Sequence, residues 1–182
     1  MLVQGLTEST LPWVLAEAVA AVALVLLAAS GLSKTYDPDP TRGAMSAAGL
    51  PSSRIVARGL GVAEIVAAIT GLAVGGPWLA IGAVLYLGFS LFTFAAVQKK
   101  LPIQSCGCFG REDTPPTTLH VVFNICSTIA LTYLAITGAT AVPWSEPPLE
   151  LALYLSFSLV GAYLAYLVLS QLPRTLKMTT DP

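Results

Sequence analysis

Two cysteines separated by a single glycine, Cys106 and Cys108, are the residues of this sequence best suited to chemistry. They lie in the polar stretch SCGCFGRED, close in sequence to Lys99, Lys100 and Arg111. Their α-carbons can be at most about 7 Å apart and disulfides favour about 5.5 Å, so a bend at the glycine would allow a disulfide. So small a ring would be strained and easily reduced, and neighbouring cations favour the reactive thiolate. The pattern predicts a redox pair that exchanges with a partner's thiols.

Two other interpretations of the cysteine pair stay open. Adjacent thiolates suit a soft ion such as Cu(I), whereas structural zinc needs four ligands. His120, the only histidine, would add a third ligand and no good fourth is evident, so no metal site is predicted. Alternatively, the glycines and cysteines form a tight structural plug over the helices.

His120 and Asn124 are four residues apart, so they share one face of the helix expected there. Because histidine titrates near neutral pH, His120 would serve as a base or proton carrier for a cysteine. A histidine that hydrogen-bonds a loop carbonyl at the membrane interface fits the same position. Cys126 points away from His120, and we interpret it as a small apolar residue buried in the protein.

Glu64 lies near the middle of the second apolar run, where an ionised carboxylate costs at least ~2.5 kcal/mol. We expect it to face protein, either protonated or hydrogen-bonded to a neighbouring helix, as a proton relay, a ligand contact or a polar clamp. Glu17, near the start of the first run and the outer interface, is interpreted as having no special role. Small residues recurring every fourth position in the second run predict a ridge for close helix packing: Gly59, Ala63, Ala67 and Gly71.

Aromatic residues gather in the third and fifth apolar runs. They would line a pocket for a quinone cofactor, although helix packing and lipid contact account for the same set. The residues are Tyr86, Phe89, Phe92 and Phe94 in the third run and Tyr154, Tyr163 and Tyr166 in the fifth.

Five apolar runs approach or reach the ~20 residues that a membrane-spanning helix needs. Only 10% of the 182 residues are charged, against about 25% in soluble domains, and a net charge of −1 offers no basic surface to nucleic acid. The sequence therefore predicts a single membrane domain, an all-α integral membrane protein built as a compact antiparallel bundle of about five transmembrane helices. The predicted spans are 11–32, 54–74, 77–97, 117–139 and 149–172.

All nine Lys and Arg residues lie in or beside the first and third connections or in the tail, 173–182. Alternating spans place these segments on one side, which the positive-inside rule makes cytoplasmic, and the three tryptophans lie at the opposite ends of the spans. We expect a multi-pass protein of the bacterial plasma membrane, with the N-terminus outside and the C-terminus and the CGCFG loop in the cytoplasm. In the first connection, a cap at Asp39 followed by Pro40 predicts a short interfacial helix over 40–48.

Three stretches, SGLSKTYDP, GVAEIVAAITG and CGCFG, together resemble the MauE family, membrane proteins of methylamine utilisation within the broader DoxX-like set. The resemblance covers roughly residues 15–139. The family is implicated in maturing the disulfide-rich small subunit of methylamine dehydrogenase, with a thioredoxin-like partner, by forming disulfides or passing reducing equivalents. The resemblance implies Cys106 and Cys108 as the redox pair. It also matches other characteristic polar positions, at Lys34, Glu64 and Asn124, although Phe123 replaces an arginine of the family pattern.

These observations favour a thiol–disulfide redox accessory factor with Cys106, Cys108, Glu64 and His120 as catalytic residues. Besides the lipid bilayer, its partner would be a thioredoxin-like protein or a membrane complex. The cytoplasmic position expected for the thiols argues against simple periplasmic oxidation. The alternatives are a non-enzymatic assembly subunit of a membrane complex that docks through its helix ridge, and a copper-handling protein.

Overall fold

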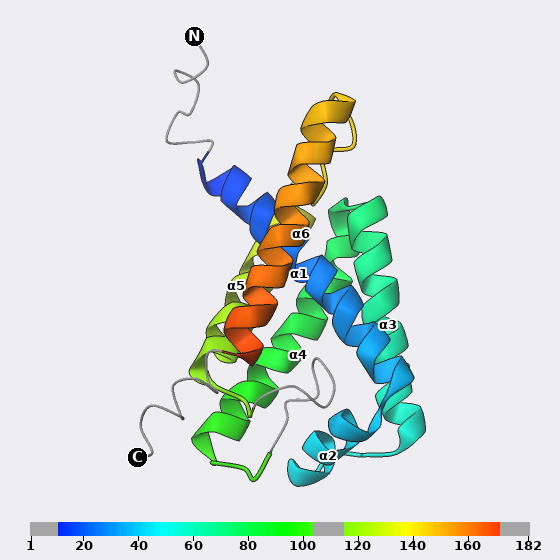
Figure 1. Cartoon of the computed structure of the whole chain (residues 1–182), viewed down its shortest axis with the longest axis vertical. Coiled ribbons are helices and arrows are strands. Elements are labelled where there is room, and N and C mark those ends of the chain that lie inside the picture. Colours follow the sequence, from blue (N-terminus) through cyan, green and yellow to red (C-terminus); the bar gives the residue numbers. More distant parts are fainter. Residues whose placement is uncertain (1–10, 104–114, 172–182) are drawn as a thin grey trace.

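The computed structural model describes residues 11–103 and 115–171, and the regular structure within these ranges is entirely helical (Figure 1). Five of the helices are long and apolar enough to cross a membrane. The prediction of an all-α membrane bundle with five spans is therefore confirmed. The helices are α1 (Leu11–Tyr36), α2 (Asp39–Ala47), α3 (Arg54–Ala73), α4 (Leu79–Gln98), α5 (Thr118–Thr137) and α6 (Pro148–Ser170), and a 3₁₀ turn, η1 (Gly76–Trp78), precedes α4.

The apolar core is built by α1, α3, α4 and α5, whereas α6 packs against α1 at the periphery (Figure 1). Inside a bilayer the lipid is as apolar as the core, so close van der Waals packing holds the helices together. Small side chains let the helices approach, and large ones fill the space that remains. The fully buried leucines of the core are Leu24, Leu27, Leu79, Leu131 and Leu134.

Local sequence determines where several helices begin and end. Ser53 caps α3, and its hydroxyl accepts a hydrogen bond from the Val56 amide at 3.2 Å. Thr117 caps α5 in a reciprocal capping box with His120. Gly138, in the left-handed conformation with φ 72°, ends α5. These caps leave α3 and α5 with defined starting points at one end of the bundle.

The short helix α2 begins differently from the prediction. Pro38 occupies its N-cap position without a side-chain hydrogen bond, so Asp39 lies in the first turn and is not the cap. The Asp39 carboxylate instead accepts hydrogen bonds from Arg42 at 2.7 Å and Arg54 at 3.4 Å. Arg42 also donates to the Ser52 carbonyl at 2.9 Å. These bonds tie α2 to the start of α3, and the one from Arg42 in particular holds the pKa of the Asp39 carboxyl below its usual value.

The ridge predicted on α3 is correct for Ala67 and Gly71, which are buried, and wrong for Gly59 and Ala63, which are exposed. A spacing of four residues advances 400° around a helix, so a ridge with that spacing drifts by about 40° at each step. The buried face of α3 alternates steps of four and three and so stays toward α1. The residues with this spacing are Ala57, Gly61, Glu64, Ala68 and Gly71, and Ala67 is buried beside them.

The first span is longer than predicted. The sequence places its end at residue 32 and treats Lys34 as a charge of the following connection, but α1 continues to Tyr36. Lys34 is therefore inside the helix and only 3% exposed. A lysine near the end of an apolar run is expected to extend its ammonium group into water. Here the ammonium group of Lys34 is instead paired with a carboxylate on α3, so the residue can remain buried in the helix.

The two ends of the bundle differ in composition. Trp13 lies early in α1, Trp78 in η1 and Trp144 in the connection before α6. The start of α1, η1 and this connection are all in the upper half of Figure 1. The last turn of α1, all of α2, the start of α3 and the end of α4 lie at the opposite end. The Lys and Arg residues of the described ranges lie near those elements: Lys34, Arg42, Arg54, Arg58, Lys99 and Lys100.

Candidate functional site

A buried ion pair joins α1 to α3 at the cationic end of the bundle. The Lys34 ammonium nitrogen lies 3.0 Å from Oε1 of Glu64 and donates a hydrogen bond to Oε2 at 3.1 Å. Lys34 also donates to the Ser30 hydroxyl one turn earlier in α1. Glu64 is completely buried, so the carboxylate that the sequence expects to face protein does so. Charges inside a membrane are rare and generally functional, and this pair is neutral as a unit.

Two glycines bring the ion pair together. A Cβ added to Gly31 would lie 2.5 Å from the Gly61 carbonyl oxygen and 3.0 Å from the Cβ of Glu64. A Cβ added to Gly61 would lie 2.8 Å from the Gly31 carbonyl oxygen and 3.0 Å from the Cβ of Lys34. Glu64 thus packs over Gly31, and Lys34 packs over Gly61. The backbones of α1 and α3 are in contact at these two glycines because neither has a side chain.

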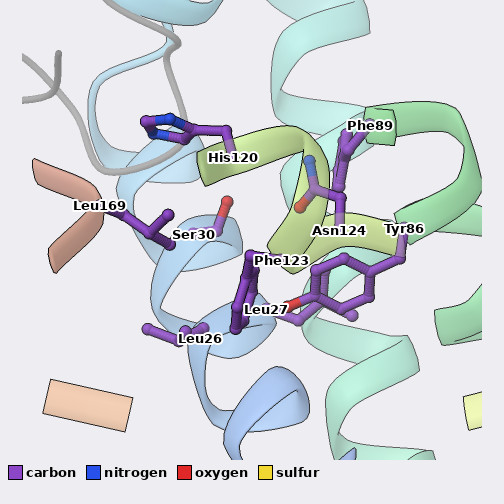
Figure 2. A pocket seen from close by; sticks show the side chains of 9 residues that line it. All are labelled: Leu26, Leu27, Ser30, Tyr86, Phe89, His120, Phe123, Asn124 and Leu169. Carbon is purple, nitrogen blue, oxygen red and sulfur yellow. The ribbon is translucent and has the colours of Figure 1, made fainter. Parts of the chain in front are cut away.

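A small cavity of about 30 Å³ lies beside the ion pair, enclosed by α1, α4, α5 and the end of α6 (Figure 2). Its polar lining comes from Ser30 on α1, Tyr86 on α4, and His120 and Asn124 on α5. The Tyr86 hydroxyl donates to the Ala23 carbonyl at 2.6 Å. A volume of this size with several polar walls suits a water molecule. The apolar lining consists of Leu26, Leu27, Phe89, Phe123 and Leu169.

His120 is held at the start of α5 by Thr117. Its Nδ1 lies 2.9 Å from the Thr117 hydroxyl oxygen and accepts a hydrogen bond from the Thr117 amide at 3.3 Å. Because Nδ1 accepts from a backbone N–H, we assign the proton of the neutral ring to Nε2. Through Nδ1 the ring thus caps its own helix. His120 and Asn124 line the same cavity, as their spacing predicts.

A larger cavity of about 230 Å³ lies on the other side of Phe89. Phe89 lines both cavities, and the Lys34 ammonium lies 5.6 Å from the centre of its ring. Lys34 lines the larger cavity and Ser30 the smaller one, so this hydrogen-bonded couple connects the two. The lining of the larger cavity is completed by Thr41, Ala44, Met45, Leu50, Leu60, Val84, Leu85, Gly88, Phe92 and Thr93.

The structure locates some of the predicted site residues and not others. Cys106 and Cys108 lie outside the described residues. The flanking residue Ile103 is buried against Ala44 of α2 and Ala96 of α4, at the cationic end. Cys126 is exposed on the outer face of α5, so the expectation of a buried cysteine is wrong. Of the aromatic set, Tyr86, Phe89 and Phe92 line these two cavities, and Tyr163 and Tyr166 line a third, more open cavity of about 390 Å³ between α1 and α6.

Lys34 is the site residue that sequence reasoning assigned to the wrong environment. A signal for it exists in the spacing of glycine and charge. Gly31 precedes Lys34 by three residues and Gly61 precedes Glu64 by three, in consecutive apolar runs. Two antiparallel helices that cross at such glycines bring the two charges to one interface.

Comparison with known proteins gives one match. The family model described as Methylamine utilisation protein MauE matches residues 11–138, from the start of α1 to the end of α5. No curated protein and no solved structure matches the sequence. The matched region contains the ion pair, both glycines of the crossing and the polar wall of the small cavity.

Proposed function

The chain belongs to the MauE family, and on that premise we propose that it is a membrane thiol–disulfide redox factor that serves the maturation of, or electron supply to, a partner protein. Cys106 and Cys108 are the exchanging pair. The observation that carries the proposal is the ion pair of Lys34 and Glu64, a costly feature inside a membrane. The position of Ile103 also supports the proposal. Ile103 precedes Cys106 by three residues and packs on α2 at the same end of the bundle as the ion pair.

The exchange is a transfer between two dithiol–disulfide couples. One thiolate of the reduced pair attacks a disulfide sulfur of the partner, forms a mixed disulfide and releases a partner thiolate. The second cysteine attacks the mixed disulfide, which forms the Cys106–Cys108 disulfide and releases the second partner thiolate. Two electrons pass to the partner, and the two protons of the cysteine thiols balance the two partner thiolates. The reverse direction uses the same steps.

The buried polar residues would carry these protons. Glu64 contacts Lys34, Lys34 contacts Ser30, and Ser30 lines the small cavity together with His120. A water in that cavity would complete a path between the carboxylate and the imidazole. We assign His120 the exchange of protons with the thiols and Glu64 the role of reservoir.

The partner is a thioredoxin-like protein or a membrane complex, met on the cytoplasmic side. The charge distribution supports that side, because the described Lys and Arg residues gather at one end of the bundle and the positive-inside rule places such an end in the cytoplasm. The alternative, a non-enzymatic assembly subunit, would dock through the exposed part of the predicted ridge, Gly59 and Ala63, because Ala67 and Gly71 are buried within the bundle.

Thiol trapping in cells tests the redox assignment. In a Cys126→Ser background, the cysteine pair should be found as a mixture of oxidised and reduced forms that shifts when a cell-wide oxidant or reductant is added. Cys106→Ser and Cys108→Ser should differ, because the variant that keeps the attacking cysteine accumulates a mixed disulfide with the partner. A pair that stays reduced under oxidant, together with full activity of the double variant, would refute the assignment.

The reservoir role of Glu64 has its own test. Glu64→Gln keeps the shape and a hydrogen-bonding group but cannot release a proton, so thiol exchange should slow by about tenfold or more, within the range for general acid–base catalysis. Glu17→Gln is the matched control on α1 and should exchange at the native rate. A folded Glu64→Gln protein with native exchange would reduce Glu64 to a polar clamp.

A further inference from the structure

The larger cavity has the features of a ligand site that opens to the bilayer. Its walls come from α1, α2, α3 and α4, and α2 closes it at the cationic end. Two lining residues, Val84 and Leu50, are 68% and 46% exposed. On a transmembrane helix an exposed apolar residue faces lipid, so a ligand can enter beside Val84 from the membrane.

The polar part of the cavity is electrically neutral. Lys34 is the one charged residue among the described lining residues, and its ammonium is paired with the fully buried Glu64 carboxylate. A carboxylate or phosphate headgroup would meet a cation that is already neutralised and a second anion behind it. A neutral carbonyl oxygen is attracted to the Lys34 ammonium as a hydrogen-bond acceptor and is not repelled by the Glu64 carboxylate.

The shape of the cavity favours a flat ring. Phe89 and Phe92, adjacent turns of α4, provide aromatic walls, and the Lys34 ammonium lies near the Phe89 ring. The volume of about 230 Å³ lies just below the ~300 Å³ lower limit of pockets for drug-sized ligands. One substituted ring fits such a space, and a long tail has to remain in the lipid.

We propose that this cavity binds the head group of an isoprenoid quinone, with a ring carbonyl toward Lys34, the ring between Phe89 and Phe92, and the tail leaving past Val84 into the bilayer. The binding proposal goes beyond the thiol chemistry and does not rest on it. If both hold, the quinone is the electron acceptor for the cysteine pair. Oxidation of two thiols to a disulfide releases two electrons and two protons, and the quinone takes up both as a quinol.

Gly88 offers a substitution that fills the cavity. It lines the cavity, and no heavy atom lies within 4 Å of the position its Cβ would occupy. Gly59, on the exposed face of α3, has equally open surroundings and does not line the cavity. Gly88→Leu and Gly59→Leu are therefore the same change in two helices, one inside the proposed site and one outside it.

The experiment uses the full chain in nanodiscs of phosphatidylcholine, with decylubiquinone as the probe and oleate as the anionic amphiphile. Decylubiquinone should compete with a photoreactive azido-ubiquinone, and the label should map to residues 41–50 or 84–93. Gly88→Leu should weaken decylubiquinone binding at least tenfold, and Gly59→Leu should change it less than twofold. The double variant Cys106→Ser/Cys108→Ser should bind like the native chain, which separates this proposal from the thiol one.

Three results would overturn the proposal. The label could map outside the cavity on the native chain, a measurement that needs no variant to fold. Oleate could compete as well as decylubiquinone, which would make the cavity an acyl-chain site. Gly88→Leu, folded by circular dichroism, could bind as tightly as Gly59→Leu.

Discussion

Among the described residues, three glutamates lie in membrane-spanning helices. Glu150 is in the first turn of α6, whereas Glu17 and Glu64 lie deeper in α1 and α3, and the surroundings of these two differ. Glu17, at the tryptophan end, is half-buried and accepts a hydrogen bond at 2.7 Å from Trp13 of the same helix. Glu64, at the cationic end, is fully buried and is paired with Lys34 of another helix. The first carboxylate is satisfied locally, whereas the second depends on the packing of two helices.

The contrast extends to the other polar groups. At the tryptophan end, two further side chains bond to backbone carbonyls of other segments: Trp144 donates to the Leu72 carbonyl at 2.8 Å, and Tyr154 donates to the Ala141 carbonyl at 2.9 Å. These bonds close helix ends and connections. At the cationic end, polar side chains bond to one another and line two cavities. The cationic end therefore contains the buried charges and polar cavity walls on which the proposed chemistry depends.

The largest expected difference between the two ends is their accessibility. In a Cys126→Ser background, a membrane-impermeant maleimide applied to intact cells should leave Cys106 and Cys108 unlabelled. They should react after permeabilisation in the presence of reductant. A reporter at the tryptophan end, Ser145→Cys in a chain without the other cysteines, should be labelled from outside, because Ser145 is exposed in the connection before α6. Labelling of the native pair from outside would reverse the orientation and restore the periplasmic oxidase interpretation.

The second largest expected difference is in the free energy of unfolding lost when each glutamate environment is altered. Lys34→Met leaves Glu64 buried without its partner, and breaking a buried ion pair costs about 3–5 kcal/mol of unfolding free energy. Replacing both residues, as Lys34→Met/Glu64→Leu, should restore most of that loss because no buried charge remains. Glu17→Gln keeps an acceptor for Trp13 and should change the free energy by less than ~0.5 kcal/mol. Reversible unfolding in mixed detergent micelles measures all three, and a double variant as unstable as Lys34→Met would contradict the ion-pair account.

The glycine crossing should respond less strongly than the ion pair. Gly61→Ala puts a methyl group 2.8 Å from the Gly31 carbonyl oxygen, and overpacking of this kind costs about 1–3 kcal/mol. Gly59→Ala has open surroundings and should be neutral or stabilising by up to ~1 kcal/mol, because alanine favours helix over glycine. The same unfolding measurement compares the two. Equal effects would show that α1 and α3 can separate without cost.

The sequence predicts the fold well because the bilayer imposes a length on each apolar run. It also predicts that Glu64 faces protein, since a carboxylate on the lipid side would be costly. It does not place Cys126, because hydropathy cannot distinguish a lipid-facing from a protein-facing position when both surroundings are apolar. The Lys34–Glu64 ion pair is not predicted for a different reason. Hydropathy treats each charged residue alone, whereas the pair depends on where α1 and α3 cross.

The smallest expected effect concerns Asp39, which is exposed and holds α2 against α3 through Arg42 and Arg54. The hydrogen bond from Arg42 lowers the pKa of the Asp39 carboxyl below the ordinary 3.8. A carboxyl with a lowered pKa in the folded protein stabilises it fully above the unfolded pKa, and that contribution is lost as the pH falls through the folded pKa. Hydrogen–deuterium exchange of α2 should therefore be faster in Asp39→Asn than in the native chain at pH 6, and the difference should shrink as the pH falls below 3.8 and through the folded pKa. Because both cations are exposed, the effect should also shrink at high salt. A difference that persists at low pH would mean that Asp39 acts through its shape and not its charge.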